Sequence, residues 1–168
     1  MCADVKELKK KAAETAVDRY IRDGMTVGLG TGSTAYYAIL RIAQIVSERK
    51  WNIICVATSE ASASLATENG LKVVDISEVD AIDVTIDGAD EVDPSMNLIK
   101  GLGGALLREK IVAAATMKEV IIVDDSKTVS LLGTKAPLPV EVVRFGHQKT
   151  AYALKAQGSE PVLRMSGG

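Results

Sequence analysis

The sequence is poor in residues that several common kinds of functional site require. It contains two cysteines, one histidine, one tryptophan and one phenylalanine in 168 residues. Cys2 and Cys55 have no CxxC spacing and are too few for a disulfide framework, so reduced thiols are expected. His147 is the single histidine, which excludes a multi-histidine metal site and leaves one side chain for histidine acid–base chemistry. No apolar run approaches the roughly 20 residues that a membrane span needs.

The remaining composition is that of a globular protein with a core. Hydrophobic residues make up 47% of the chain and charged residues 25%, which are ordinary values. The length favours one domain with a small appendage. A formal net charge of -2 disfavours nucleic acid or an anionic membrane as the main partner. The N-terminal segment is charged and amphipathic, unlike a signal peptide, so a cytoplasmic location is expected.

Short apolar runs alternate with helical patterns through most of the chain. Helical patterns cover residues 4–23, 33–49, a stretch ending near 70, and 105–117; strand-like runs cover 25–29, 53–57, 71–74, 81–86 and 120–123. This alternation predicts an α/β fold, a doubly wound, mostly parallel, Rossmann-like sheet with helices on both faces. Four runs end in the polar loops GTGST, TSEAS, DGADE and DDSK. Because ligands bind beyond the carboxyl ends of such strands, these loops should meet along one edge.

The pattern changes after residue 136. PLPVEVV predicts an edge or linker strand, because Pro137 and Pro139 lack backbone donors. A helix over 147–157 and a strand over 161–165 should follow, too few elements to bury a core alone. We therefore expect a Rossmann-like catalytic domain over 1–136 and the beginning of a small α+β (ferredoxin-like) domain over 137–168, cut short at the end of the chain.

The glycine loop GLGTGST, residues 28–34, favours a bound anion. It lacks the lysine of a Walker A loop, and Ser33 stands where a dinucleotide fingerprint needs its third glycine. Its glycines allow close approach, Thr31, Ser33 and Thr34 offer hydroxyls, and a helix N-terminus follows. The alternative is a tight turn with an ordinary Ser/Thr cap.

Two further loops carry charged residues. DGADE, residues 87–91, places three acids in five positions, which leaves open a Mg²⁺ site, hydrogen bonds to polyol hydroxyls, or a solvated acidic turn. KGLGG, residues 100–104, presents backbone amides suited to an oxyanion, and Glu109 one turn into the next helix could reach back over it. The alternative for 108–110 is a solvated helix face. Lys127 could neutralise a phosphate or be a surface lysine.

Together these segments resemble the A-type ribose-5-phosphate isomerases. The matching strings are GTGSTA at 30–35, TSE at 58–60, TIDGADEVD at 85–93, LIKGLGGALLREKIV at 98–112, VDDSK at 123–127 and PLPVEV at 137–142. The resemblance implies an isomerase that interconverts D-ribose 5-phosphate and D-ribulose 5-phosphate through an enediolate, in the non-oxidative pentose phosphate pathway. It implies no cofactor, no metal, a sugar phosphate as the partner, and a homodimer or homotetramer.

The resemblance also implies roles for individual residues. Glu109 matches the catalytic base, with Lys100, Asp87 and Asp90 assisting the reaction. The matched substrate-binding residues are Thr31, Gly32, Ser33 and Thr34; Asp87, Gly88, Ala89 and Asp90; Lys100, Gly101, Leu102 and Gly103; and Lys127. Lys10, in preference to Lys9, matches a lysine that approaches the phosphate. Leu102 replaces a glycine of bacterial members, so its side chain should point away from the sugar while its backbone donor is unaffected.

Two other classes of function compete with this interpretation. A non-catalytic sugar-phosphate sensor would keep the pocket without the chemistry, and the presence of Glu109 and Lys100 argues against it. An amino-sugar-phosphate deaminase of similar architecture would be expected to use a histidine, and none lies among the loops at this edge.

Overall fold

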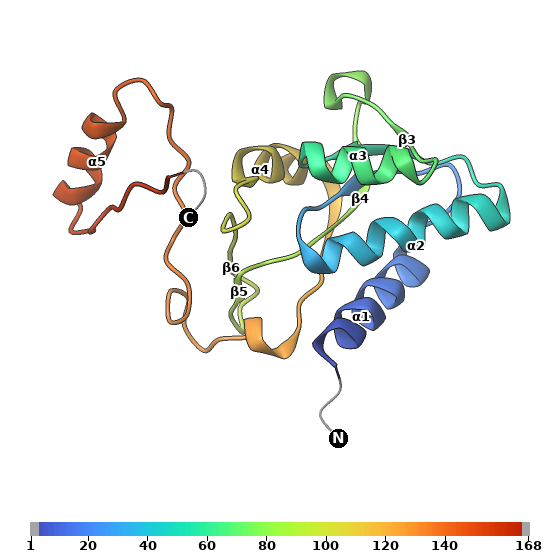
Figure 1. The fold of residues 1–168 in the computed structure, drawn as a ribbon, viewed down its shortest axis with the longest axis horizontal. Coiled ribbons are helices and arrows are strands. Elements are labelled where there is room, and N and C mark those ends of the chain that lie inside the picture. The colour runs from blue at the N-terminus through green and yellow to red at the C-terminus, as the bar shows by residue number, and fades with distance from the viewer. Residues whose placement is uncertain (1–3, 166–168) are drawn as a thin grey trace.

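The computed structural model describes residues 4–165, which contain a five-stranded parallel sheet in the order β3-β2-β1-β4-β7 (Figure 1). Cys2 lies outside the described residues. The main elements are α1 (Val5–Tyr20), β1 (Thr26–Leu29), α2 (Ser33–Arg49), β2 (Ile54–Ala57), α3 (Glu60–Glu68), β3 (Lys72–Val73), β4 (Ile82–Asp87), α4 (Leu106–Ala114), β7 (Thr116–Ile121) and α5 (His147–Ala156). The predicted α/β class is therefore confirmed. No helix within residues 4–165 has the length and apolar character needed to cross a membrane.

The direction of the crossovers places the helices on two faces of the sheet. From β1 the chain moves outward through β2 to β3, and from β4 it moves the opposite way to β7. Since such crossovers are right-handed, α2 and α3 cover one face and α4 covers the other. The larger core lies under α1 and α2, which lie side by side (Figure 1), and includes Val17, Leu29 and Ile39. On the opposite face Val56 packs with Val112 of α4.

Two glycines of the first strand and loop are required by close packing. A Cβ on Gly28 would lie 1.9 Å from the Thr85 hydroxyl, and one on Gly30 would lie 2.2 Å from Oδ1 of Asp87. Both neighbours belong to β4, which pairs with β1 in parallel register. The glycines therefore bring the end of β4 directly against the glycine loop, which positions the site.

A small hairpin and one short helical turn, η2 (Asp125–Lys127), extend the carboxyl edge of the sheet. The hairpin pairs β5 (Glu91–Val92) with β6 (Leu98–Ile99) in antiparallel register, and a further 3₁₀ turn forms η1 (Ile76–Glu78). The sequence analysis did not predict this hairpin. It returns the chain from the DGADE loop to the KGLGG loop, so that the two loops lie together.

Several predicted boundaries are wrong. The helix predicted over 105–117 ends at Ala114, and the strand predicted over 120–123 already begins at Thr116 because it pairs with β4 from Ile82 onward. α1 ends at Tyr20, where the amide of the next residue bonds back to Val17, three residues before the expected end.

The predicted strands over 137–143 and 161–165 are not formed in the part of the chain that the structure describes. Neither segment pairs with a described strand. Only α5 is present here, ending one residue before the expected boundary, and none of its residues is buried. In Figure 1 it lies well away from the sheet.

Candidate active site

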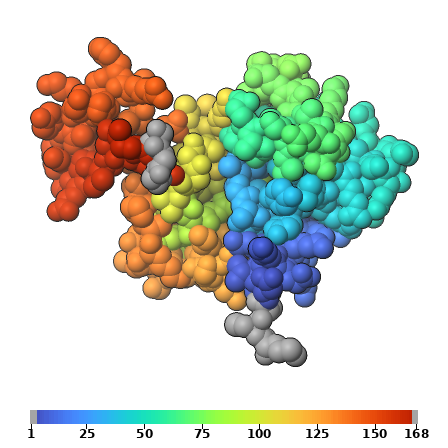
Figure 2. All heavy atoms as spheres, viewed as in Figure 1, coloured from blue at the N-terminus to red at the C-terminus, as the bar shows by residue number. Residues whose placement is uncertain are grey.

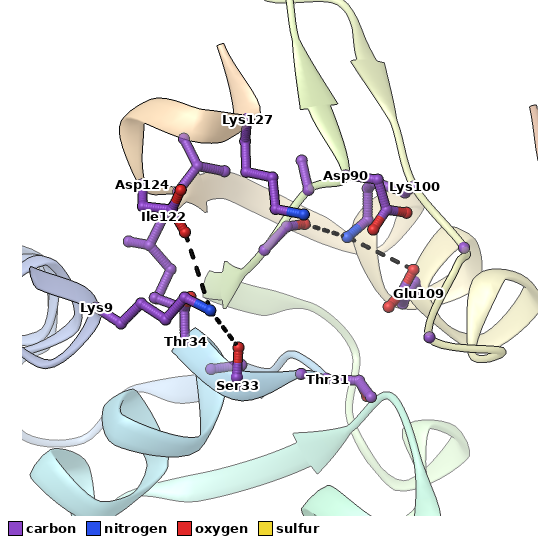
Figure 3. Close-up of a pocket in the computed structure, with 17 residues that line it drawn as sticks. Lys9, Thr31, Ser33, Thr34, Asp90, Lys100, Glu109, Ile122, Asp124 and Lys127 are labelled. Carbon is purple, nitrogen blue, oxygen red and sulfur yellow. Dashed lines mark hydrogen bonds and ion pairs between the residues drawn. The ribbon is translucent and has the colours of Figure 1, made fainter. Parts of the chain in front are cut away.

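A cavity of about 150 Å³ lies beyond the carboxyl ends of the strands, where the polar loops meet (Figure 3). Five separate stretches of the chain line it. The lining residues are Lys9; Thr31, Gly32, Ser33, Thr34 and Ala35; Gly88, Ala89 and Asp90; Lys100, Gly101, Gly103 and Glu109; and Ile122, Val123, Asp124 and Lys127. The predicted convergence is therefore observed for the GTGST, DGADE and DDSK loops, whereas no residue of TSEAS lines the cavity.

The amino end of α2 forms one wall of the cavity and has the character of an anion site. Gly32 is the N-cap, with φ +116°, a conformation that favours glycine, and α2 has no side-chain cap. Its first backbone N–H groups therefore remain available to a ligand. Nζ of Lys9 donates to the Ser33 hydroxyl at 2.9 Å and brings a positive charge to the same place.

The structure corrects the choice of the lysine that α1 contributes to the cavity. Lys9, not Lys10, reaches the cavity, where it also lies 3.9 Å from Asp124. Lys10 points along the helix surface and lies 4.0 Å from Glu14. Successive helical residues differ in direction by about 100°, so only one of two adjacent lysines can face the sheet edge.

The Thr31 hydroxyl has a structural task. It lies 2.7 Å from the Thr58 hydroxyl and donates to Ser59 Oγ at 2.8 Å, and Ser62 completes the cluster. These contacts join the glycine loop to the TSEAS loop. The Thr31 hydroxyl therefore serves to join these two loops.

Asp87 is buried beneath the cavity and organises two loops. Its side chain is 1% exposed and accepts from the amides of Thr31 (3.1 Å) and Gly88 (2.7 Å). Its second oxygen accepts from Nζ of Lys100 at 3.0 Å, and the Gly88 carbonyl accepts from the same ammonium at 2.5 Å. Asp87 does not line the cavity, and its predicted contact with substrate stays a prediction.

Asp90 joins the DGADE and KGLGG loops from the cavity side. Its carboxylate accepts from the Leu102 amide at 2.9 Å, and its own amide donates to the Ile99 carbonyl. Leu102 does not line the cavity, and its backbone N–H, which was predicted to be unaffected by the side chain, donates to Asp90. Gly101 and Gly104 have φ of +108° and +80°, which explains the glycines of this turn.

Glu109 is the carboxylate at the centre of the site. It is 5% exposed, and its Oε2 forms an ion pair with Lys100 Nζ at 3.5 Å but no hydrogen bond within residues 4–165. Burial raises the pKa of Glu109; the Lys100 ammonium opposes this shift, and the Asp87 and Asp90 carboxylates add to it. A buried carboxyl with a raised pKa and an oxygen that accepts no hydrogen bond suits a general base.

Lys127 supplies a second positive charge opposite α2. It lies in η2, whose N-cap Asp124 accepts from the Ser126 amide. The Ser126 hydroxyl and amide lower the pKa of Asp124 against the effect of its partial burial, and Lys9 and Lys127 contribute. Asp124 was not predicted as a site residue, although it belongs to the matched DDSK segment, and it stands between the two lysines.

The acidic loop shows no arrangement suited to a metal ion. No group of three His, Cys, Asp or Glu side chains within residues 4–165 has metal-ligand geometry. A lysine ammonium lies between Asp87 and Glu109, in contact with both. His147 lies on α5, where its Nδ1 is 3.1 Å from the Arg144 carbonyl, and it does not line the cavity.

The fold and this edge of the sheet define an α/β protein with a small polar cavity, lined by lysines and a buried carboxyl group. Residues 54–168 match the family model of ribose 5-phosphate isomerase A (phosphoriboisomerase A). The chain is 51% identical over 160 residues to the ribose-5-phosphate isomerase A of Chloroflexus aurantiacus, which covers 95% of this chain and 67% of that protein. The chain therefore belongs to the ribose 5-phosphate isomerase A family, a family of aldose–ketose isomerases.

Solved structures agree with this assignment. The ribose 5-phosphate isomerase A of Methanocaldococcus jannaschii superposes with a TM-score of 0.93 at 37% identity, covering 97% of this chain and 72% of that one. A D-ribose-5-phosphate isomerase in complex with phospho-erythronic acid superposes with a TM-score of 0.92 at 40% identity, covering 97% and 71%. The chain spans about two thirds of the length of the relatives it matches.

Proposed function

We propose that this cavity binds ribose 5-phosphate and ribulose 5-phosphate, and that Glu109 transfers the proton between C2 and C1. The observation that carries the proposal is the buried Glu109 carboxylate, with one oxygen free of hydrogen bonds and Lys100 beside it. The family assignment and a relative's complex with a phosphorylated sugar acid support the substrate class.

The phosphate binds at the end of the cavity formed by α2, Lys9 and Lys127. The unpaired amides of the helix end and two ammonium groups match a dianion in both charge and hydrogen-bonding capacity. Lys9 already donates to Ser33, so it can turn to the phosphate with little movement. Asp90 is the carboxylate available for sugar hydroxyls.

The reaction needs one base and one oxyanion donor. Glu109 removes the C2 proton of the open-chain aldose; the C–H electrons form the C1=C2 bond, and the former carbonyl electrons pass to O1. Lys100 and the Gly103 region stabilise the negative charge on O1. Protonated Glu109 then returns the proton to C1, and the hydroxyl proton moves from O2 to O1, which gives the ketose. Asp87 holds Lys100 in place for this task.

A coupled isomerase assay on ribose 5-phosphate tests the proposal. We expect Glu109→Gln to lower kcat by about 10²–10⁴-fold, the usual contribution of a positioned base, with KM little changed. Glu119→Gln is the control, because Glu119 also interacts electrostatically with Lys100 but is exposed and does not line the cavity. Activity should persist in EDTA. Normal kcat in Glu109→Gln, or loss of turnover in EDTA, would exclude this mechanism.

The division at residue 137, the assembly and the location are further proposals. We propose that residues 137–168 belong to a second domain, because α5 buries none of its residues and Phe145 is 97% exposed.

The exposed apolar side chains of Phe145 and Val143 support a homodimer or homotetramer. We place the protein in the cytoplasm. Light scattering on the purified chain and its fractionation in cells test these points, and a monomer at all concentrations would contradict the assembly.

A further inference from the structure

Glu91 is a buried carboxylate for which the proposed reaction has no use. It is 0% exposed and does not line the cavity. Its Oε2 accepts from the Gly133 amide at 2.5 Å, and its Oε1 accepts from the amides of Lys135 (2.5 Å) and Ala136 (2.7 Å). Burial opposes ionisation, but these three donors and the Lys135 ammonium lower the pKa of Glu91. Glu91 is therefore an anion that fixes the backbone of residues 133–136.

The segment 133–136 also contacts the backbone on both sides of Lys127, through the side chain of Lys135. Nζ of Lys135 donates to the Ser126 carbonyl at 2.7 Å and to the Thr128 carbonyl at 3.1 Å. These two carbonyls belong to the residues immediately before and after Lys127. One ammonium therefore holds the backbone on both sides of the lysine that lines the cavity.

The strand that bears Glu91 contacts the same segment directly. Val92 forms an isolated parallel bridge with Thr128, and its carbonyl accepts from the Val129 amide at 2.9 Å. Glu91 and its neighbour thus restrain the chain around Lys127 from two directions. η2 has only three residues, too few to be rigid without such external contacts.

We propose that Glu91 and Lys135 are positioning residues for phosphate binding, which hold Lys127 at the cavity through the backbone carbonyls of Ser126 and Thr128. This proposal rests on the phosphate role proposed above for Lys127. A lysine side chain has considerable rotamer freedom, so a backbone fixed at its base reduces the entropy lost when phosphate binds. The phosphate is contacted equally in substrate and transition state, so the effect should be on KM and not on kcat.

Double-mutant cycles test the proposal. Glu91→Gln places an amide N–H₂ against backbone N–H donors, and Lys135→Met removes the ammonium while leaving the bonds to Glu91 in place. Each variant is made with Lys127 present and with Lys127→Ala, and KM for ribose 5-phosphate, kcat and the inhibition constant of inorganic phosphate are measured. Lys135→Arg is the conservative variant, and Lys155→Met, an exposed lysine on α5, is the control.

We expect Glu91→Gln and Lys135→Met to raise KM and the phosphate inhibition constant by about 3–10-fold, with kcat within about twofold. Lys135→Arg should restore binding, and Lys127→Ala should abolish the effect of both variants. Equal effects in both backgrounds, or a loss of kcat alone, would overturn the inference. If Lys127→Ala itself leaves both constants unchanged, the phosphate role of Lys127 fails first. If Lys127→Ala raises them and Lys135→Met does not, only the positioning role fails.

Discussion

At the scale of single residues, Glu109 is placed at a cost to folding. A carboxyl whose pKa is raised in the folded protein contributes stability that is present below its unfolded pKa and lost as the pH rises through its folded pKa. At neutral pH the buried charge therefore destabilises the fold. The property that suits Glu109 to take a proton is the same one that makes it unfavourable to bury.

We predict that Glu109→Gln stabilises the protein at neutral pH. Each unit of pKa elevation corresponds to about 1.4 kcal/mol, or about 3–6 °C in Tm for a chain of this size. The gain should fall towards zero below about pH 4, where the glutamate is protonated in both states. Thermal unfolding from acid to neutral pH measures it. A variant less stable than the parent at neutral pH would contradict the prediction that the buried Glu109 charge destabilises the fold.

The pH dependence of turnover should report the same shift. We predict that the acidic limb of kcat/KM lies above about pH 4.3, the ordinary carboxyl value, because Glu109 must be ionised to act as a base. Asp87→Asn should move this limb to lower pH, since it removes a negative neighbour and frees Lys100 to pair with Glu109. Rates measured from about pH 4 to 8 test both parts. A limb that moves to higher pH in Asp87→Asn would refute the assigned coupling.

At the scale of elements, the sequence predicts the helices and strands whose own residues carry a clear hydrophobic pattern or end signal. α2 begins and ends at the predicted residues 33–49, because a glycine loop precedes an amphipathic helix and Lys50 in the left-handed conformation ends it. β7 was predicted four residues late because it is an edge strand whose Met117 and Lys118 are exposed, so it lacks an apolar alternation. The β5–β6 hairpin, with two residues per strand, is too short to leave a pattern.

The candidate site was predictable to the level of loops but not of individual contacts. The polar loops were placed correctly at one edge, and most of the residues predicted for them line the cavity. Asp87, Leu102 and Lys10 do not, for reasons that depend on packing. The Asp87 carboxylate accepts a hydrogen bond from Lys100, and the Leu102 amide donates to Asp90. The rotation of α1 about its axis turns Lys10 away from the cavity, towards Glu14. These contacts depend on the tertiary structure, so no local sequence pattern predicts them.

The helix that bears Glu109 depends on a distant residue. Its N-cap position, Ala105, makes no side-chain cap, and the Leu107 amide instead donates to Glu141 Oε2 at 2.7 Å. A carboxylate at this end also interacts favourably with the helix dipole. The segment after residue 137 therefore stabilises the first turn of α4.

We predict that Glu141→Ala lowers the free energy of unfolding by about 0.5–1 kcal/mol, the usual value of a helix cap. Glu141→Gln should lose less, because it keeps an acceptor. Hydrogen exchange of the α4 amides should quicken in Glu141→Ala, which separates this cap from a general loss of stability. Glu160→Ala, an exposed glutamate, is the control. Unchanged exchange in α4 would mean that Glu141 does not cap the helix.

At the scale of the whole molecule, the cavity joins parts of the chain that are far apart in sequence. Lys9 comes from the first helix, the glycine loop from the first crossover, and Lys127 from a turn beyond β7. Figure 2 shows the N-terminal helix in blue and the turn in orange on adjoining parts of the surface. A ligand that contacts all three can bind only when the tertiary structure is formed, so its binding energy adds to the stability of the whole fold.

Inorganic phosphate should therefore protect the entire domain against heat. At a concentration of about 100 times its Kd, phosphate should add about 2.7 kcal/mol to the free energy of unfolding. Each kcal/mol should raise Tm by about 2–4 °C. Lys9→Met and Lys127→Ala should each reduce this protection, because each removes a charge from a different segment, whereas Lys10→Met should not. Sodium chloride at matched ionic strength separates specific binding from screening, which acts on all exposed charges. If Lys10→Met reduces the protection as much as Lys9→Met, the phosphate is not held where α1 meets α2.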